Sequence, residues 1–234
     1  MDRGKLTLSM IVKNESGRFL HEALQRHKKF IDEAVIIDDG STDNTAEICL
    51  EALAGIPVRV IRNECSKFHD EVTLRKQQWD ETVLTSPQWI MNLDADEMFE
   101  ESFDKLQVDE LISQTDHDVF YFRLYDMWSS THYRDDAYWQ AHHFYRPFLV
   151  RYRPDIPYVW RETPQHCGRF PLSIGHFTYQ CHPARIQHFG WSREEDRAAK
   201  YKRYQLLDPD ARYGWKEQYE SILDESPPLV KWEE

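Results

Sequence analysis

Four short apolar runs alternate with helix-like stretches over the first hundred residues, and this alternation most constrains the fold. The runs lie at residues 6–12, 34–37, 57–61 and from 89 onward, and they are rich in β-branched residues, as buried strands are. The stretches between them carry apolar side chains at helical spacing, with Ser16 and Asp43 as suitable N-caps for the first two. Strands that alternate with helices in this way predict an α/β fold with a parallel sheet and crossover helices.

Acidic residues directly follow two of these runs. Asp38 and Asp39 end the second run, and Asp94, Asp96 and Glu97 end the fourth. Because parallel strands end at one edge of a sheet, where open α/β folds bind ligands, we expect these carboxylates to gather there. Asp94 and Asp96 alternate along the strand and can share a face, while Glu97 should point elsewhere. Gathered carboxylates favour a hard divalent cation; an acidic helix N-terminus is the alternative reading.

The charge balance excludes one class of partner. The 234 residues include 41 acidic and 29 basic side chains, a net charge of −12, whereas non-specific nucleic-acid binding needs a basic surface. An anionic ligand would therefore need a cation or a local basic pocket. The four cysteines show no metal-binding spacing and are expected to be free thiols. The chain shows no signal-like N-terminus and no apolar segment of about 20 residues, which predicts a soluble, cytoplasmic protein without a transmembrane segment.

The second half of the chain is less regular. Its expected elements are a helix near 103–113, strands at 119–125 and 184–191, and a charged helix capped by Ser192. That last helix places Lys200 and Arg203 on one face. Aromatic side chains crowd residues 126–160, a pattern that suits either stacking on a polar ring such as a sugar or simple covering of the sheet.

Three motifs resemble family 2 glycosyltransferases of the GT-A fold. They are Met10-Ile-Val-Lys-Asn14-Glu15, Val35-Ile-Ile-Asp-Asp39-Gly-Ser-Thr-Asp43-Asn-Thr45 and Asn92-Leu-Asp94-Ala-Asp96-Glu97, in that order and spacing. The stretch from His188 to Tyr204 is similar to a downstream pattern of one subgroup. The resemblance implies a Rossmann-like, mainly parallel sheet flanked by helices, with a mixed acceptor-side half. Residues 1–100 would bind the nucleotide sugar, and residues 101–234 of the same domain would bind the acceptor and supply catalytic groups.

The resemblance also implies a reaction of the hexosyltransferase type. A sugar would move, with inversion, from a nucleotide diphosphate sugar, usually a UDP-sugar, to a hydroxyl of a glycan, lipid-linked or protein acceptor. A Mn²⁺ or Mg²⁺ ion would neutralise the departing diphosphate. Asp96, Asp94 and His188 would hold it, with a contact to the diphosphate or a purely structural histidine as the alternatives for His188. The residues implied for the nucleotide sugar are Val12, Asn14, Glu15, Asp39, Arg75, Asn92, Asp94, Ala95, Lys200 and Arg203.

No motif identifies the general base that must take the acceptor's proton. Relatives often carry a carboxylate after a histidine in the second half, but this chain has His166-Cys167 there. Glu162 is the first candidate and His166 the second, with Asp126 and Asp135 left open. For Glu162, a loop ion pair with a neighbouring arginine is an equal alternative.

Two other functions fit part of the pattern. A metal-dependent nucleotidyltransferase would also place carboxylates at strand ends, but it would normally have a glycine-rich basic loop where this chain has residues 13–16. A non-catalytic nucleotide- or sugar-binding module is favoured by the missing carboxylate at Cys167. The acidic pair and His188 count against it, since sugar binding by aromatics needs no metal.

Overall fold

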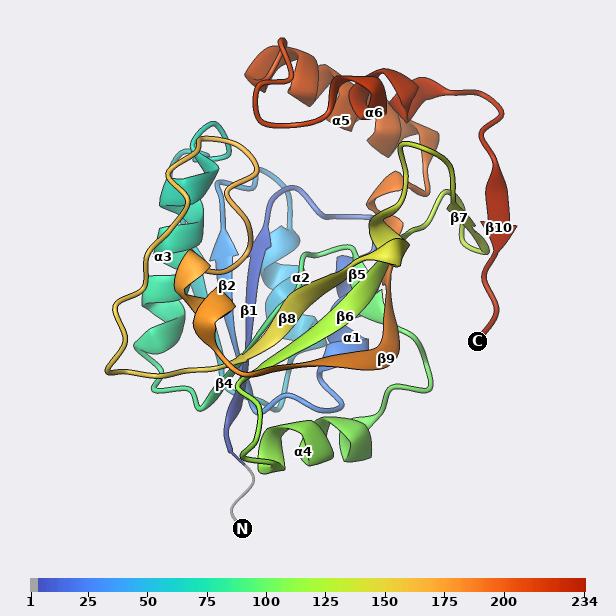
Figure 1. Ribbon diagram of the computed structural model, residues 1–234. Helices are drawn as coiled ribbons and strands as arrows, with labels where there is room; N and C mark the ends of the chain where they lie inside the picture. The colour runs from blue at the N-terminus through green and yellow to red at the C-terminus, as the bar shows by residue number, and fades with distance from the viewer. Residues whose placement is uncertain (1–3) are drawn as a thin grey trace.

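The structure, a computed structural model, describes residues 4–234 and contains an eight-stranded sheet with helices on both faces (Figure 1). The strands are β1 (Leu6–Val12), β2 (Glu33–Asp38), β3 (Val58–Arg62), β4 (Trp89–Asn92), β5 (Glu97–Phe99), β6 (Val119–Asp126), β7 (His132–Arg134), β8 (Tyr145–Arg151), β9 (Tyr179–His188) and β10 (Leu229–Lys231). The α-helices are α1 (Leu20–His27), α2 (Thr45–Ala52), α3 (Glu71–Val83), α4 (Lys105–Ser113), α5 (Glu194–Leu207) and α6 (Lys216–Glu220). Short 3₁₀ turns include η1 (Ala141–His143), η2 (Leu172–His176), η3 (Phe189–Trp191) and η4 (Ser221–Leu223).

The sheet order β3-β2-β1-β4-β8-β6-β9-β5 joins both halves of the chain. The first four strands are parallel, as the strand–helix alternation predicts. Strand β8 then pairs antiparallel with both β4 and β6, β6 pairs parallel with β9, and β5 closes the edge antiparallel to β9. The predicted α/β class with a mainly parallel, partly mixed sheet is confirmed.

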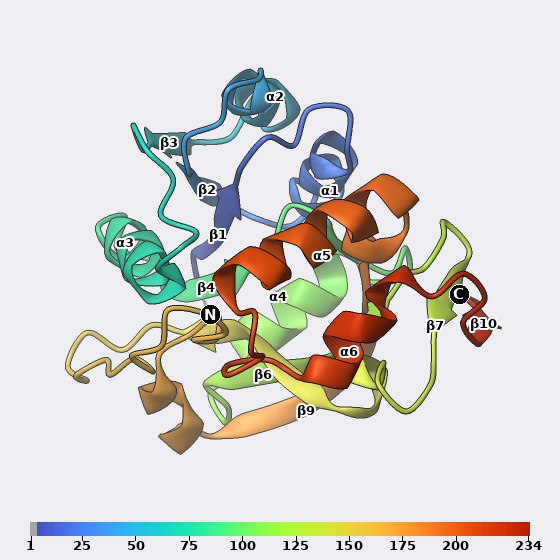
Figure 2. The same cartoon turned by 90° about the horizontal axis from the view of Figure 1, so that it is seen from above.

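The two faces of β1 show how the sequence directs the packing. Leu6, Leu8 and Met10 alternate into the core cluster that includes side chains of α1, α2 and α4. Ile11 lies on the other face, against Leu74 of α3. Figure 2 shows the same division, with α1, α2 and α4 on one side of the sheet and α3 on the other. Because β1 is covered on both faces, its apolar run is nearly continuous.

Helix α5 lies over the edge at which β1 and β2 end, and α6 lies beside it (Figures 1 and 2). The turn η3 leads from the end of β9 to this helix. The carboxyl edge of the parallel strands is therefore roofed by a segment from the last quarter of the chain. Across residues 4–234, no helix has both the length and the apolar character that crossing a membrane requires.

Several local predictions were wrong. Helix α1 begins at Leu20 and α5 at Glu194, so neither Ser16 nor Ser192 is the N-cap, and Ser192 instead donates to the carbonyl of Phe189. The carboxylate of Asp43 does accept from the backbone N–H of Thr45, although α2 starts one residue later than a cap at Asp43 would place it.

Strands β5, β7, β8 and β10 were not predicted, because they are short or interrupted by prolines and charges. The aromatic-rich stretch is divided between interior and surface, and Tyr138, Phe144 and Tyr145 are exposed. Trp128 and Trp139 pack with Trp191 in one buried cluster, and Trp160 lies in another, which leaves these three tryptophans of residues 126–160 unavailable for stacking on a sugar. The four cysteines are free, as expected.

Candidate active site

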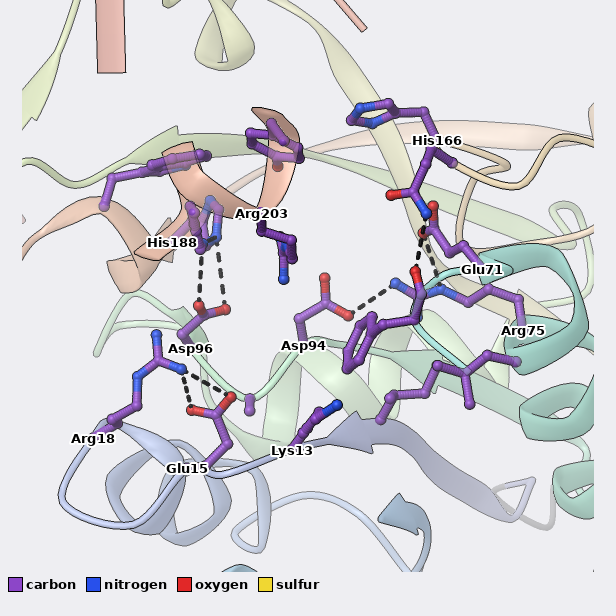
Figure 3. A pocket seen from close by; sticks show the side chains of 18 residues that line it. Lys13, Glu15, Arg18, Glu71, Arg75, Asp94, Asp96, His166, His188 and Arg203 are labelled. Carbon is purple, nitrogen blue, oxygen red and sulfur yellow. Dashed lines mark hydrogen bonds and ion pairs between the residues drawn. The ribbon is translucent and has the colours of Figure 1, made fainter. Parts of the chain in front are cut away.

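A cavity of about 240 Å³ lies between the end of the parallel strands and α5. Its floor comes from the segments after β1 and β4, one wall from α3, and its roof from α5 (Figure 3). The side chains that line it are those of Ile11, Lys13, Glu15, Arg18, Phe68, Glu71, Leu74, Arg75, Asp94, Ala95, Asp96, Gln165, His166, His188, Trp191, Lys200, Arg203 and Tyr204. Basic, acidic and aromatic groups thus converge on one space, which we call the first cavity.

Asp94 is held by two arginines. Its Oδ1 lies 3.2 Å from Arg75 Nη2, and its Oδ2 lies 4.0 Å from Arg169 Nη2. Burial raises the pKa of Asp94, but Arg75 and then Arg169 outweigh this effect and hold the pKa well below its ordinary value. Glu97 points elsewhere, as predicted, and makes a two-pronged ion pair with Arg169.

Asp96 meets two basic groups from the second half of the chain. Its Oδ1 lies 3.6 Å from His188 Nε2, and its Oδ2 lies 3.6 Å from Lys200 Nζ. Burial raises the pKa of Asp96, but Lys200 and then His188 outweigh this effect and lower the pKa below its ordinary value. The carboxylate therefore stays ionised. His188 Nδ1 in turn lies 2.8 Å from Asp126 Oδ1, which fixes the ring and leaves Nε2 facing Asp96.

Gly190 keeps open the space between these three groups. A Cβ at this position would lie 2.3 Å from Asp96 Oδ2, 2.7 Å from His188 Nε2 and 2.1 Å from Lys200 Nζ. A carboxylate oxygen and an imidazole nitrogen thus converge on a cradle that any side chain at residue 190 would fill. The carboxylate oxygen suits Mn²⁺ or Mg²⁺, and the imidazole, which suits zinc more specifically, can add one nitrogen ligand, so this pair can hold the predicted ion. Asp94 does not join the pair, because among residues 4–234 the ligand atoms of Asp94, Asp96 and His188 do not all lie within 4.8 Å of one another.

Glu15 lies on the Asp96 side of the first cavity (Figure 3), where the charges of Asp96 and Lys200 act on its carboxyl group. Burial raises its pKa to about 7, against the opposing effect of Arg18, whose guanidinium lies 3.1 Å from Glu15 Oε2. Arg18 also contacts Asp196 of α5, at 3.1 Å. The loop after β1 is therefore tied by charge to the helix that roofs the cavity.

The structure brings together most of the predicted site residues, but not all of them. Glu15, Arg75, Asp94, Ala95, Asp96, His166, His188, Lys200 and Arg203 line the first cavity. Val12, Asn14, Asp39, Asn92 and Glu162 do not.

The predicted nucleotide residues outside the cavity shape its walls. Asp39 is buried and its carboxylate accepts hydrogen bonds from Asn63, Ser66 and the backbone of Lys67, which fixes the loop that presents Phe68 to the cavity. Asn14 accepts a hydrogen bond from the backbone N–H of Thr42. These contacts give Asp39 and Asn14 a structural role in the described conformation.

The remaining pair, Val12 and Asn92, is buried. Val12 belongs to the hydrophobic core. Asn92 donates from its side chain to the carbonyl of Arg169, which holds the loop that carries this arginine.

A second cavity of about 550 Å³ adjoins the first. Glu71, Arg75, Asp94 and His166 line both, so they mark the junction between the two spaces. Arg146, Arg161 and Arg169 contribute further positive charge to the second cavity.

The candidate bases are widely separated. His166 lies at the junction. Glu162 lines neither cavity; its side chain is 67% exposed and its Oε1 lies 2.7 Å from Lys76 Nζ. The ion pair expected with an arginine is thus made with a lysine of α3. Asp126 contacts His188 and lines neither cavity. Asp135 forms a separate cluster with His142 and His143, and these three residues also lie outside both cavities.

Sequence reasoning missed several residues of the site. Glu71 and Arg169 carry no motif of their own, and Trp191 and Tyr204 lie in the stretch from His188 to Tyr204 but were given no role; all four reach the cavities. Arg18 could have been found from its spacing, since it lies three residues after Glu15 and pairs with it.

Comparison with known proteins assigns the sequence that builds this site to a family. The sequence profile described as glycosyl transferase family 2 matches residues 7–167, which is more than half of the chain. The chain belongs to glycosyl transferase family 2. The family 2 resemblance of the three motifs is thereby confirmed, and the matched region carries the floor and the α3 wall of the first cavity.

Relatives of this family 2 chain include two mycobacterial proteins. The uncharacterized proteins Rv3786c of Mycobacterium tuberculosis and Mb3815c of Mycobacterium bovis are each 26% identical over 231 residues, covering 92% of the chain. The chain spans 54% of the length of these relatives. Crystal structures of Staphylococcus aureus TarS share the fold. One, at 14% identity with a TM-score of 0.52, covers 94% of this chain and 42% of TarS. Another, TarS 1-349 in complex with UDP, has 16% identity and a TM-score of 0.51. It covers 94% of this chain and 69% of the TarS fragment.

Proposed function

We propose that this family 2 chain is a metal-dependent inverting glycosyltransferase that moves a sugar from a nucleotide diphosphate sugar to an acceptor hydroxyl. The observation that carries the proposal is the convergence of Asp96, His188 and Lys200 over Gly190, at the carboxyl edge of the parallel strands. A UDP-sugar is the donor we expect. TarS, which shares the fold, has been crystallised with UDP and with UDP-GlcNAc.

Asp96 and His188 would hold Mn²⁺ or Mg²⁺. When bound, the ion supplies positive charge to the diphosphate as the bond to the sugar breaks. Lys200 would then lose its contact with Asp96 and become available to the departing phosphates. Arg203, from the next turn of α5, reaches across to the Phe68 ring at 5.8 Å and would close the same end.

The other walls of the first cavity suit a nucleoside. Ile11, Leu74 and Phe68 offer apolar surface, and Lys13 lies 5.6 Å from the centre of the Phe68 ring. Arg75 stays fixed between Glu71 and Asp94, so its remaining N–H groups are oriented before a ligand arrives. The acceptor would approach through the second cavity, which meets the first at Asp94 and His166.

A thermal-shift panel tests the donor class. UDP, GDP, CDP and their sugars are compared with and without Mn²⁺; a ligand that binds the folded chain raises the melting temperature. We expect UDP compounds to act only with metal, and we expect the chain to release free sugar slowly from a UDP-sugar when water replaces the acceptor. Pyrophosphate release from UTP would instead indicate the nucleotidyltransferase, and binding without turnover would indicate the non-catalytic module.

A further inference from the structure

His166 has an unusual backbone for a residue with a side chain. Its φ is +54°, in the left-handed region that favours glycine. Strained residues of this kind persist where the surroundings hold them, and they concentrate at functional sites. Here the conformation presents the imidazole at the junction of the two cavities.

Two residues that follow α5, Asp208 and Tyr219, hold the imidazole of His166 by a chain of hydrogen bonds. His166 Nε2 lies 2.7 Å from the hydroxyl of Tyr219, and that hydroxyl lies 3.1 Å from Asp208 Oδ2. Tyr219 and Asp208 are buried, with 4% and 3% of their surface exposed. The Tyr219 ring stacks on Tyr204 with centroids 4.5 Å apart and an angle of 5°. A Cβ on Gly214 would lie 1.9 Å from the Tyr219 hydroxyl, so the glycine is needed for this placement.

The direction of these hydrogen bonds follows from Asp208. Its carboxylate accepts from the backbone N–H groups of Arg212, Tyr213 and Gly214. Burial raises the pKa of Asp208, but these three bonds outweigh it and the pKa is lowered. An ionised carboxylate can only accept, so Tyr219 must donate its one hydrogen to Asp208. Burial and then Asp208 raise the pKa of Tyr219, which keeps that hydrogen in place.

The Tyr219 oxygen can then only accept from His166. The neutral imidazole therefore carries its hydrogen on Nε2, and Nδ1 keeps a free lone pair. Within residues 4–234, no protein group forms a hydrogen bond with Nδ1.

We propose that His166 Nδ1 is the general base of this enzyme and that Tyr219 and Asp208 are the residues that position it; the inference rests on the proposed function. The acceptor oxygen bonds to the anomeric carbon, and the bond from that carbon to the phosphate oxygen breaks, with its electron pair leaving on the nucleoside diphosphate. The acceptor proton passes to Nδ1. The imidazolium that forms keeps its Nε2–H on Tyr219, close to the charge of Asp208, and releases the new proton to solvent because His166 is exposed.

The test measures the rate at which the full chain, with Mn²⁺, hydrolyses a UDP-sugar, so that water takes the place of the acceptor. The donor is whichever of UDP-glucose, UDP-galactose and UDP-GlcNAc the wild-type chain hydrolyses fastest. His166→Gln is expected to lower kcat about 100-fold, the size of a typical general-base effect, without changing KM or the affinity for UDP. Tyr219→Phe, which removes one oxygen, is expected to lower kcat about tenfold, as the loss of one hydrogen bond would. Asp208→Asn should act in the same direction.

Two matched controls separate positioning from folding. Tyr213→Phe makes the same chemical change at an exposed tyrosine, and Asp210→Asn does so at an exposed aspartate two residues from Asp208. A second readout is the ¹⁵N spectrum of the His166 ring. We expect a protonated Nε2 and an unprotonated Nδ1 in the wild-type chain, and a mixture of both neutral forms in Tyr219→Phe.

The outcomes are distinguishable. A wild-type chain that neither binds UDP nor hydrolyses a donor would refute the proposed function. A chain that binds UDP but shows hydrogen on Nδ1, or whose hydrolysis is unaffected by His166→Gln, would refute the inference alone. If UDP binds without measurable hydrolysis, the ¹⁵N spectrum decides the inference by itself.

Discussion

Lys200 Nζ lies 3.6 Å from Asp96 Oδ2, so an ammonium group from α5 neutralises the carboxylate that follows β4. A divalent ion at Asp96 would compete with this contact. Asp96→Asn should therefore remove the Mn²⁺-dependent part of UDP binding, a loss of about 100-fold or more, while the fold is kept because asparagine has nearly the same shape and can still accept hydrogen bonds. Isothermal titration with UDP in Mn²⁺ and in EDTA measures the effect; equal affinity of variant and wild type in Mn²⁺ would refute the metal assignment.

Gly190→Ala is expected to close the metal cradle without unfolding the chain. The added Cβ would collide with the ends of Asp96, His188 and Lys200, and the carboxylate and the ammonium can move aside by rotation. The variant should melt near the wild-type temperature and bind Mn²⁺ about tenfold more weakly or worse. Gly175→Ala is the control, because a Cβ there meets no atom within 4 Å. Equal Mn²⁺ affinity of both variants would contradict the prediction.

Asp126→Asn tests whether the partner of His188 controls the ligand nitrogen. The 2.8 Å contact to Nδ1 keeps the hydrogen there and leaves the lone pair on Nε2, which faces Lys200 Nζ at 3.4 Å and would turn to a metal when one is bound. The amide of asparagine can donate to Nδ1, whereas the carboxylate can only accept from it. The variant therefore permits the tautomer of His188 that carries its hydrogen on Nε2 and cannot bind a metal there. Metal affinity should fall about 10- to 100-fold, measured by competition with a fluorescent chelator. An unchanged affinity would assign the Asp126–His188 pair to structure alone.

Glu162→Gln separates the two candidate bases named from the sequence. The Glu162 carboxylate lies outside both cavities and contacts Lys76, and an exposed ion pair of this kind contributes at most about 1 kcal/mol. Donor hydrolysis should stay within about twofold of wild type. A fall comparable to that of His166→Gln would return Glu162 to the role of base, and Lys76→Met would show whether the ion pair matters to it.

His27 gives the fold a defined sensitivity to acid. It is fully buried, and burial, followed by the charge of Arg26, lowers its pKa from 6.5 to about 3. Between these two pH values the unfolded chain binds a proton that the folded chain does not, so stability is lost as pH falls from 6.5 toward 3. The loss from this group is about 1.4 kcal/mol per pH unit. His27→Leu should flatten urea-denaturation stability between pH 6.5 and 5 relative to wild type, whereas His21→Gln, at an exposed position of α1, should not.

The parallel half of the sheet could be predicted because β1, β2 and β4 are buried on both faces and read as apolar runs, and the edge strand β3 is rich in β-branched residues. The acidic residues after β2 and β4 could be placed at one edge for the same reason. Their partners could not. Asp39 is engaged by residues 63–67, and Asp94 by Arg75 and Arg169, 19 and 75 residues away along the chain. Whether a carboxylate is free for a ligand depends on such contacts, which no local pattern encodes.

The same limit explains the base. The sequence shows His166 at the place where relatives often have a histidine followed by a carboxylate. It does not show what positions this histidine, because Tyr219 lies 53 positions later and Asp208 follows an exposed, charged helix. Strand β8 was missed because a proline and flanking arginines interrupt its apolar run, and it forms a strand nevertheless through its pairing with β4 and β6.

Residues 7–167 carry the family profile, yet His188, Lys200, Arg203 and Tyr219 all come after it. A fragment cut at the end of that match would retain the apolar walls proposed to face a nucleoside and lose Lys200 and Arg203, the α5 cations proposed to act on the leaving group. Exchanging α5 alone for that of a relative would, conversely, change the charges above the first cavity while the sheet beneath stayed as it is. The chain therefore divides its chemistry between two regions that could diverge at different rates.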